Sequence, residues 1–285
     1  MEPENAQRSG VKVTYLPLRE VETTGEASAL YDAWLGEVGE QLARTDTDRN
    51  DVARDILRGI YFPALPADVD ESRLPAATRV LLAGLDPRAA TLEPEYYRDI
   101  DPERYYARKP LIWLWQMFDR SALGANVELG VRFRRLLAPY VFKRVGRKFK
   151  AFHFVEVSYG YNLEVGDDVV IHRNVHLDDR GGILIGDRVS ISDYAAVFSH
   201  THSINEINEV TCVPTVIGDD VRITYGAVVL AGVHVGTHGM VGARALATRD
   251  VRPYHVNVGI PAKSVRVKSI APPEFQPDIN VPHED

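Results

Sequence analysis

The sequence contains a single cysteine, Cys212, among its 285 residues. One thiol excludes an internal disulfide framework and any zinc site built from cysteines. No histidine or basic cluster stands beside it in the sequence to lower the pKa of the thiol. We therefore interpret Cys212 as an unreactive loop residue.

Long apolar runs are also missing. The longest, LIWLW at 111–115, is far too short to span a bilayer. The first ten residues, MEPENAQRSG, are polar and lack the apolar core of a secretory signal, so a cytoplasmic location is expected. Residues 1–150 contain neither a glycine-rich phosphate loop nor metal-ligand spacing, and they indicate no activity by themselves.

Negative charge predominates, with a net charge of −7, but residues 110–150 alone carry +7. Two interpretations of this basic block are open. One is contact with an anionic partner: a weak contact between residues 131–150 and a membrane surface, a lipid-linked saccharide, or the coenzyme of a neighbouring subunit. The other is a helix that packs its Phe and Leu side chains on the protein while its arginines stay solvated. No recognised nucleic-acid module accompanies the block, so no nucleic-acid partner is expected.

The first half of the chain is predicted to be helical. The segment SALYDAWLGEVGEQLAR places an apolar residue at every fourth position, at Leu30, Trp34, Val38 and Leu42. Ser28 is its expected N-cap. SRLPAATRVLLAGL predicts a second helix. Residues 110–150 predict one or two more, interrupted near Gly124 and Pro139.

From Val165 onward a period of six residues replaces the helical period. Its first position holds an aliphatic residue twelve times: Val165, Ile171, Leu177, Ile185, Ile191, Val197, Ile217, Ile223, Val229, Val235, Val241 and Ala247. Its fifth position is small or slim, and a glycine often follows the first, which we relate to a sharply bent backbone. Hexapeptide units of this kind predict a parallel β-helix of three-sided coils whose first-position side chains point inward.

The repeat has one long interruption, within VFSHTHSINEINEVTCVPTVIGDD at 197–220. The break opens with His200 and His202. Because stacked coils offer no concave pocket on their own faces, a loop extruded from them is the expected place for a functional site.

The repeats, with LDDRGGILIGDRVSISDYAAVFSHTHSI and VGIPAKSVR, resemble the hexapeptide-repeat acyltransferases, in particular the maltose, galactoside and xenobiotic O-acetyltransferase branch. The resemblance covers roughly Val157 to Lys268. It implies a left-handed parallel β-helix. It also implies a homotrimer that binds acetyl-CoA in the clefts between subunits.

The resemblance also implies roles for particular residues. His202 has the phase of the family's catalytic base, and His200 is its partner or the alternative base. Coenzyme A is expected to contact the last coils at Ala243, Thr248, Arg249 and Lys263. The acceptor is expected to contact Asn174 and Asp178. Because a thioester is already activated, a base that deprotonates the acceptor hydroxyl suffices and no metal is expected.

We thus predict an α-helical N-terminal domain (1–150), a β-helix acyltransferase domain (151–268) and an extended tail (269–285). The expected activity is acetyl transfer from acetyl-CoA to a hydroxyl of a saccharide or similar small acceptor. One alternative is a zinc enzyme resembling the gamma-class carbonic anhydrases. Two of its three ligand histidines lie five residues apart, whereas His172 and His176, like His234 and His238, lie four apart. The other alternative is a β-helix scaffold without catalytic activity.

Overall fold

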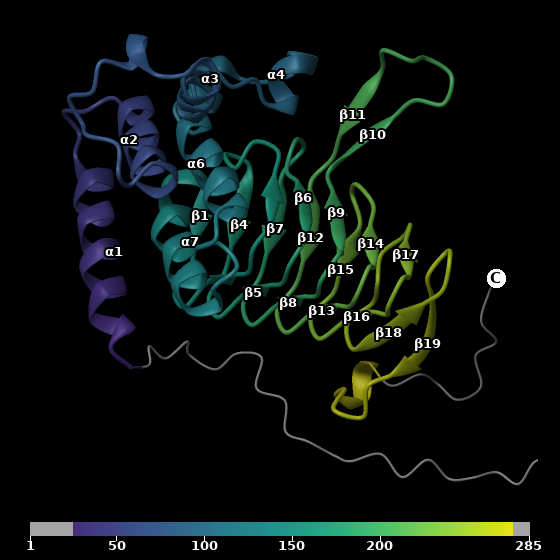
Figure 1. Cartoon of the computed structure of the whole chain (residues 1–285). Coiled ribbons are helices and arrows are strands. Elements are labelled where there is room, and N and C mark those ends of the chain that lie inside the picture. Colours follow the sequence, from purple (N-terminus) through teal and green to yellow (C-terminus); the bar gives the residue numbers. More distant parts are fainter. Residues whose placement is uncertain (1–24, 276–285) are drawn as a thin grey trace, which may run out of the picture.

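The computed structural model describes residues 25–275. Residues 1–24 of the predicted helical domain and residues 276–285 of the predicted extended tail lie outside this range. Helices cover the N-terminal end of a long stack of strands (Figure 1). The helices are α1 (Ala27–Ala43), α2 (Arg49–Tyr61), α3 (Ala76–Leu85), α4 (Glu93–Tyr97), α5 (Pro102–Tyr106), α6 (Lys109–Arg120) and α7 (Val127–Val141), with short 3₁₀ turns at Glu71–Arg73 and Pro273–Phe275.

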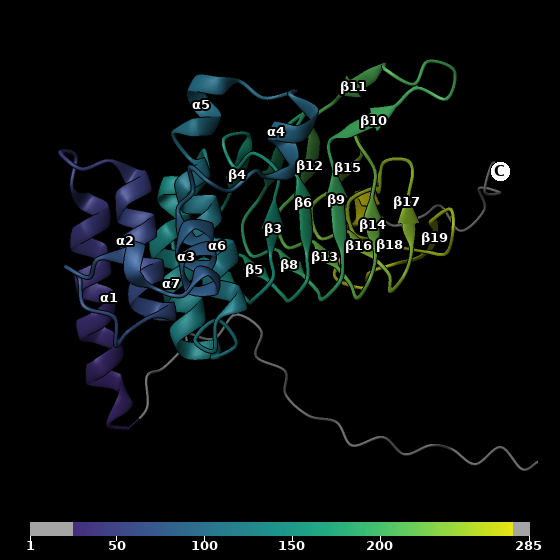
Figure 2. The same cartoon turned by 45° about the horizontal axis from the view of Figure 1, so that its top comes forward.

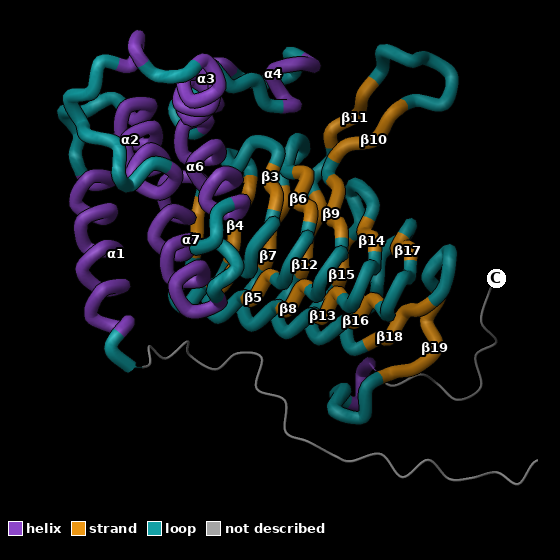
Figure 3. Tube along the Cα trace, viewed as in Figure 1, coloured by secondary structure: helices purple, strands orange, loops and turns teal. Residues whose placement is uncertain are grey.

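The strands form three parallel sheets that make the three sides of each coil (Figures 1 and 3). Sheet A contains β1 (Arg144–Val145), β4 (Leu163–Val165), β7 (Ile183–Ile185), β12 (Thr215–Ile217) and β15 (His234–Val235). Sheet B contains β2 (Lys150–Ala151), β5 (Val170–Ile171), β8 (Ser190–Ile191), β13 (Arg222–Ile223), β16 (Met240–Val241), β18 (His255–Val258) and β19 (Lys263–Val267), the last antiparallel to β18. Sheet C contains β3 (Glu156–Val157), β6 (His176–Asp178), β9 (Ala196–Phe198), β14 (Val228–Val229) and β17 (Leu246–Ala247). The predicted fold class, a left-handed parallel β-helix preceded by an α-helical region, is confirmed.

The first-position residues of the six-residue repeat point into the prism, as predicted. All twelve first-position residues are at most 1% exposed and form the core of the prism. The glycines that follow them serve a different purpose from the one expected. Gly166, Gly186 and Gly218 do not have positive φ; the left-handed conformation falls two residues later, as at Asp168. A Cβ at Gly218 would lie 2.8 Å from the backbone nitrogen of Thr237 in the next coil. Close stacking of coils, rather than a bend, requires these glycines.

The helical region corrects several predictions. Helix α1 begins at Ala27 after Glu26, with no side-chain cap, so the prediction of Ser28 as N-cap was wrong. Leu30 is 72% exposed, and the buried stripe is Leu35, Val38 and Leu42. A spacing of exactly four drifts by about 40° per step around a helix with 3.6 residues per turn, which moves the stripe off Leu30.

The two helices within residues 110–150 agree more closely with the prediction than α1 does. The break near Gly124 exists between α6 and α7, but Pro139 lies within the last turn of α7 rather than ending it. A proline so close to the end removes a single intrahelical hydrogen bond. No periodic pattern in the sequence predicted α2, α4 or α5, and α4 and α5 span only five residues each.

Helix α7 packs against β2 at the base of the β-helix, with Phe133 and Leu137 fully buried. The expectation that its arginines stay solvated is wrong for Arg134, which is 1% exposed. Its Nε donates to Asp119 Oδ1 over 2.7 Å, and its Nη1 donates to the carbonyl of Ala151 in β2 over 3.2 Å. Asp119 in turn accepts from the backbone N–H of Phe154. This buried ion pair joins α6 and α7 to the first coil. Contact of residues 131–150 with a membrane surface stays a prediction.

One hydrophobic core runs without a break from Leu35 in α1 to Val251 after the last full coil. The first strand, β1, begins at Arg144, three residues after the end of α7. The domain boundaries 1–150, 151–268 and 269–285 stay a prediction.

Candidate functional site

The interruption of the repeat is a β-hairpin that leaves the prism between sheets C and A. Strands β10 (His200–His202) and β11 (Val210–Cys212) pair antiparallel with each other and with no coil. Both views show the hairpin projecting from the corner of the third coil, on the same side as α4 (Figures 1 and 2). Its tip exposes Ile204 and Ile207, which are 99% and 89% accessible.

His200 and His202 lie side by side at the root of the hairpin. Their Nε2 atoms are 3.3 Å apart, and the two rings meet edge to face with centroids 5.1 Å apart. Only 11% of the His200 side chain is exposed, whereas His202 is an exposed residue. The pair thus has one inner and one outer imidazole.

The carboxylate of Asp178 lies against the inner imidazole. Its Oδ2 lies 2.7 Å from Nδ1 of His200, and its side chain is only 4% exposed. An ionised carboxylate at that distance favours a proton on Nδ1, which leaves Nε2 of His200 as an acceptor. His202 can then donate its Nε2–H to His200, and Nδ1 of His202 keeps a free lone pair. This arrangement orders the two imidazoles so that the outer one can accept a proton.

Arg180 ties Asp178 to the helical region. Its guanidinium, with 6% of the side chain exposed, lies 2.9 Å from Glu93 and 3.1 Å from Asp99, and its Nε lies 3.8 Å from Asp178. Its guanidinium also stacks over the ring of Tyr97, 5.4 Å from the centroid. The α4 segment is therefore fixed to the strand that carries the partner of His200.

A cavity of about 500 Å³ opens beside the histidines and is the candidate acyl-transfer cleft. Its lining residues are Phe198, His200, Thr201, His202, Leu230, Ala231 and Thr248. Of the predicted site residues, the structure thus brings His200, His202 and Thr248 to one cavity and places Asp178 directly behind it. Arg249 is exposed and follows Thr248 at the same corner.

The other predicted residues lie elsewhere. Asn174 has a left-handed conformation in the turn between β5 and β6, at the corner between sheets B and C. Ala243 is exposed in the corresponding turn between β16 and β17. Lys263 begins β19, next to Ala262, whose N–H donates to Leu246 in β17. None of the three lines the histidine cavity of this chain.

Phe198 and Leu230 were missed by sequence reasoning. Both lie on the outer surface of sheet C, at positions where the hexapeptide repeat accepts any residue type, so the pattern gave no signal for them.

Cys212 was interpreted as a loop residue and instead lies in β11, directly opposite His200. Burial, together with Asp99 and Asp178, raises the pKa of its thiol. Cys212 is therefore held as a thiol rather than a thiolate, in agreement with the expected lack of reactivity.

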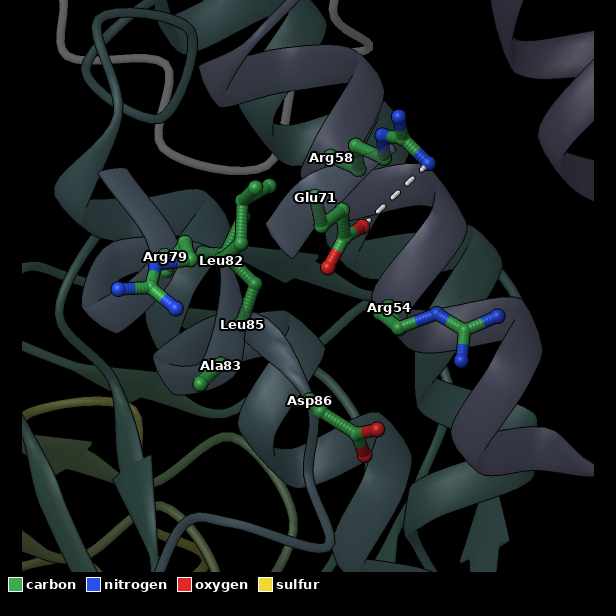
Figure 4. Close-up of a pocket in the computed structure, with 8 residues that line it drawn as sticks. All are labelled: Arg54, Arg58, Glu71, Arg79, Leu82, Ala83, Leu85 and Asp86. Carbon is green, nitrogen blue, oxygen red and sulfur yellow. Dashed lines mark ion pairs between the residues drawn. The ribbon is translucent and has the colours of Figure 1, made fainter. Parts of the chain in front are cut away.

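A second cavity, of about 360 Å³, lies far from the histidines between α2 and α3 (Figure 4). Three arginines line it, but Arg54 pairs with Asp51 and Asp55, and Arg58 lies 3.9 Å from Glu71. Its positive charge is largely balanced within the helical region.

Within residues 25–275, no group of three or more His, Cys, Asp or Glu side chains is arranged to hold a metal ion. His172 stacks on Phe152, and burial lowers its pKa, while His176 lies 4.0 Å from Glu156. His238 stacks on Tyr254. None of the helices in this part of the chain combines the length and apolar character needed to cross a membrane.

No family model matches the chain. Galactoside O-acetyltransferase of Escherichia coli K12 is 29% identical over 140 residues, which cover 48% of this chain and 69% of that protein. A putative acetyltransferase of Schizosaccharomyces pombe is 31% identical over 113 residues, but the match spans only 38% of this chain and 55% of the relative. A solved galactoside acetyltransferase in complex with coenzyme A superposes with a TM-score of 0.50 and 26% identity, covering 62% of this chain and 92% of that structure.

Proposed function

We propose that the chain is an acyltransferase of the hexapeptide-repeat type, similar to the galactoside and maltose O-acetyltransferases, and that it transfers an acetyl group from acetyl-CoA to a hydroxyl of a saccharide or similar small acceptor. The observation that carries this proposal is the ordered pair of imidazoles at the mouth of the cavity, backed by the buried carboxylate of Asp178.

His202 acts as the general base in this proposal. An alcohol is a weak nucleophile and must lose its proton as it attacks the thioester carbonyl. The free Nδ1 of His202 takes that proton, and the thiolate of coenzyme A leaves once the tetrahedral intermediate collapses. His200 and Asp178 position His202 and spread the positive charge that it acquires. No covalent enzyme intermediate is needed.

Coenzyme A lies along the last coils in this proposal. Thr248 already borders the cavity, and the exposed Arg249 beside it offers positive charge for the phosphates of the coenzyme. Lys263, at the start of β19, would contact the coenzyme further along the last coils. The partly apolar lining by Phe198 and Leu230 suits the pantetheine arm. Ala243 and the polar Asn174 lie at a different corner of the coil, where in a trimer they would meet ligands bound to a neighbouring subunit.

A homotrimer is part of the proposal. The hairpin stands clear of its own coils, and two-stranded hairpins alone are marginally stable. Its exposed isoleucines at 204 and 207 are best explained by contact with a second copy of the chain.

The test is acetyl-CoA turnover with a panel of sugars, comparing the wild type with His202→Ala, His200→Ala and Asp178→Asn. We expect His202→Ala to lower kcat by at least about a hundredfold, the scale of general-base catalysis. Asp178→Asn should lower kcat about tenfold or more without changing the KM for acetyl-CoA, because His200 loses the partner that fixes its tautomer.

An exposed histidine outside the cavity, His234, provides the matched control, and His234→Ala should retain full activity. A full rate in His202→Ala together with a hundredfold loss in His200→Ala would instead assign the base to His200. Full activity in both histidine variants would reject the proposed site.

A further inference from the structure

The outer surface of sheet C changes from polar to apolar along the prism. Its strands stack in register, so outward side chains form two rows. One row is Glu156, His176, Ala196, Val228 and Leu246; the other is Ser158, Asp178, Phe198, Leu230 and Thr248. The first two coils thus present polar groups and the later coils mainly apolar ones. The two catalytic imidazoles stand where the surface changes, since His200 contacts Asp178 on one side and lines the cavity with Phe198 on the other.

The helical region covers the polar end of this surface and forms one wall of a further, partly open cavity of about 300 Å³. The α4 segment contributes Glu93 to it, and α6 contributes Trp113 and Gln116. Sheet C contributes Glu156 of β3, Ser158 directly after β3, and His176 of β6. Figure 2 shows α4 lying over the first strands of sheet C. Without the helices this cavity would be an open, flat surface.

This cavity and the cleft at the histidines are neighbours on one face. The ring of His176, which lines the first, lies 5.8 Å from the ring of Phe198, which lines the second. Glu93 is also linked to the catalytic pair through Arg180 and Asp178. A ligand in the helix-covered cavity would therefore lie next to the reacting groups.

The chemistry of the lining selects a particular kind of ligand. It offers two carboxylates, an imidazole, an amide and hydroxyls, and it includes no lysine or arginine. Such groups accept hydrogen bonds from hydroxyls and donate hydrogen bonds to them. The carboxylate of Glu93 is balanced by Arg180, so the carboxylate of Glu156 is the group that repels anions. Trp113 is only partly buried, and its Nε1–H already donates to the carbonyl of Gly84, so its ring offers an apolar face rather than a donor. The volume is at the lower end of the range for small-molecule sites.

We propose that this cavity is the acceptor pocket, and that it takes one uncharged, hydroxyl-bearing ring whose reacting hydroxyl points toward His202. The helical region, through Trp113 and Gln116, then determines acceptor specificity. The assignment of the bound ring as an acetyl acceptor rests on the proposed function, but the binding of the ring does not.

Calorimetric titration of the full-length protein tests the proposal without turnover. The probes are the methyl glycosides of galactose, glucose, mannose and N-acetylglucosamine, each compared with its 6-phosphate. We expect at least one neutral glycoside to bind saturably and its 6-phosphate to bind at least about tenfold more weakly, a difference of ~1.4 kcal/mol. Trp113→Leu, Gln116→Ala and Glu156→Gln should each weaken neutral-glycoside binding about tenfold or more.

Glu164→Gln is the matched control, because Glu164 is likewise an outward glutamate on a coil strand but lies on sheet A, paired with Lys143. It should bind the glycoside as the wild type does. If Trp113→Leu unfolds, Gln116→Ala and Glu156→Gln still decide the outcome. The proposal is overturned if no neutral glycoside binds, if a 6-phosphate binds more tightly, or if the pocket variants bind normally.

Titration with coenzyme A separates this proposal from the proposed function. Glycoside binding that depends on Trp113, in a protein that does not bind coenzyme A, would reject acetyl transfer and retain the pocket. Coenzyme A binding and His202-dependent turnover, with acceptor KM unchanged in the pocket variants, would retain acetyl transfer and reject the pocket.

Discussion

Asp179 is the clearest case of a single residue whose environment sets its behaviour. It is fully buried next to Asp178, and its carboxylate accepts hydrogen bonds from the backbone N–H groups of Tyr159 and Asn162. Burial raises its pKa to about 6, although these amides pull the pKa downward. Two adjacent aspartates thus differ in role: Asp178 orients an imidazole, and Asp179 closes the turn before sheet A.

The raised pKa predicts a pH dependence of stability. A carboxyl whose pKa is higher in the folded than in the unfolded state stabilises the fold when protonated, and this contribution is lost as pH rises through about 6. The free energy of unfolding of the wild type minus that of Asp179→Asn should fall by about 2.4 kcal/mol from pH 4 to pH 7.5. Urea denaturation across this range measures it. A difference that is constant with pH would show that Asp179 is not shifted.

Among the elements, α6 and α7 depend on the buried pair of Asp119 and Arg134 for their attachment to the first coil. Burial raises the pKa of Asp119 and lowers that of Arg134, so the pair is stable only while each partner compensates the other. This pair therefore helps to keep the helical region in place over the polar end of sheet C.

Arg134→Met should therefore lower the free energy of unfolding by about 3–5 kcal/mol, since it leaves a buried carboxylate without its partner. The double variant Asp119→Leu with Arg134→Met should recover part of the loss. Arg44→Met is the control: Arg44 pairs with Asp46 on the surface, with 58% of its side chain exposed, and its removal should leave the free energy of unfolding nearly unchanged. Chemical denaturation compares the variants. A loss in Arg134→Met no larger than in the control would contradict this role.

For the whole molecule, the proposed trimer explains why an exposed hairpin carries isoleucines at its tip. We predict a sedimentation mass of three times 31.8 kDa for the full chain. The double variant Ile204→Ser with Ile207→Ser should dissociate at a concentration at least about tenfold higher than the wild type, because each buried isoleucine contributes ~1.5–3 kcal/mol.

Leu30→Ser serves as the control for the trimer, because Leu30 is an equally apolar side chain, 72% exposed on α1 and far from the hairpin. Its sedimentation should match that of the wild type. A wild-type monomer at all concentrations, or a hairpin variant as tightly associated as the control, would refute the trimer.

The sequence by itself determined the prism and the place where it is interrupted. Inward residues such as Val165 and Val197 recur at a fixed period because every coil meets the same neighbours, above and below, so local sequence and tertiary contact repeat together. Because the rest of the repeat is regular, the sequence also indicated the interruption that begins with His200 and His202. Short helices such as α4 had no such repetition, and the sequence did not reveal them.

Only the tertiary structure decided which groups meet at the site. The contact of Asp178 with His200 joins the end of β6 to the root of the hairpin. The contact of Glu93 with Arg180 joins residues that are 87 positions apart in the sequence. These pairs occur once each, between surfaces that carry no repeated constraint, so no period or spacing in the sequence records them. The cavity under Trp113 likewise exists because α6 folds back over sheet C, an arrangement set by the buried core between the helices and the first coil.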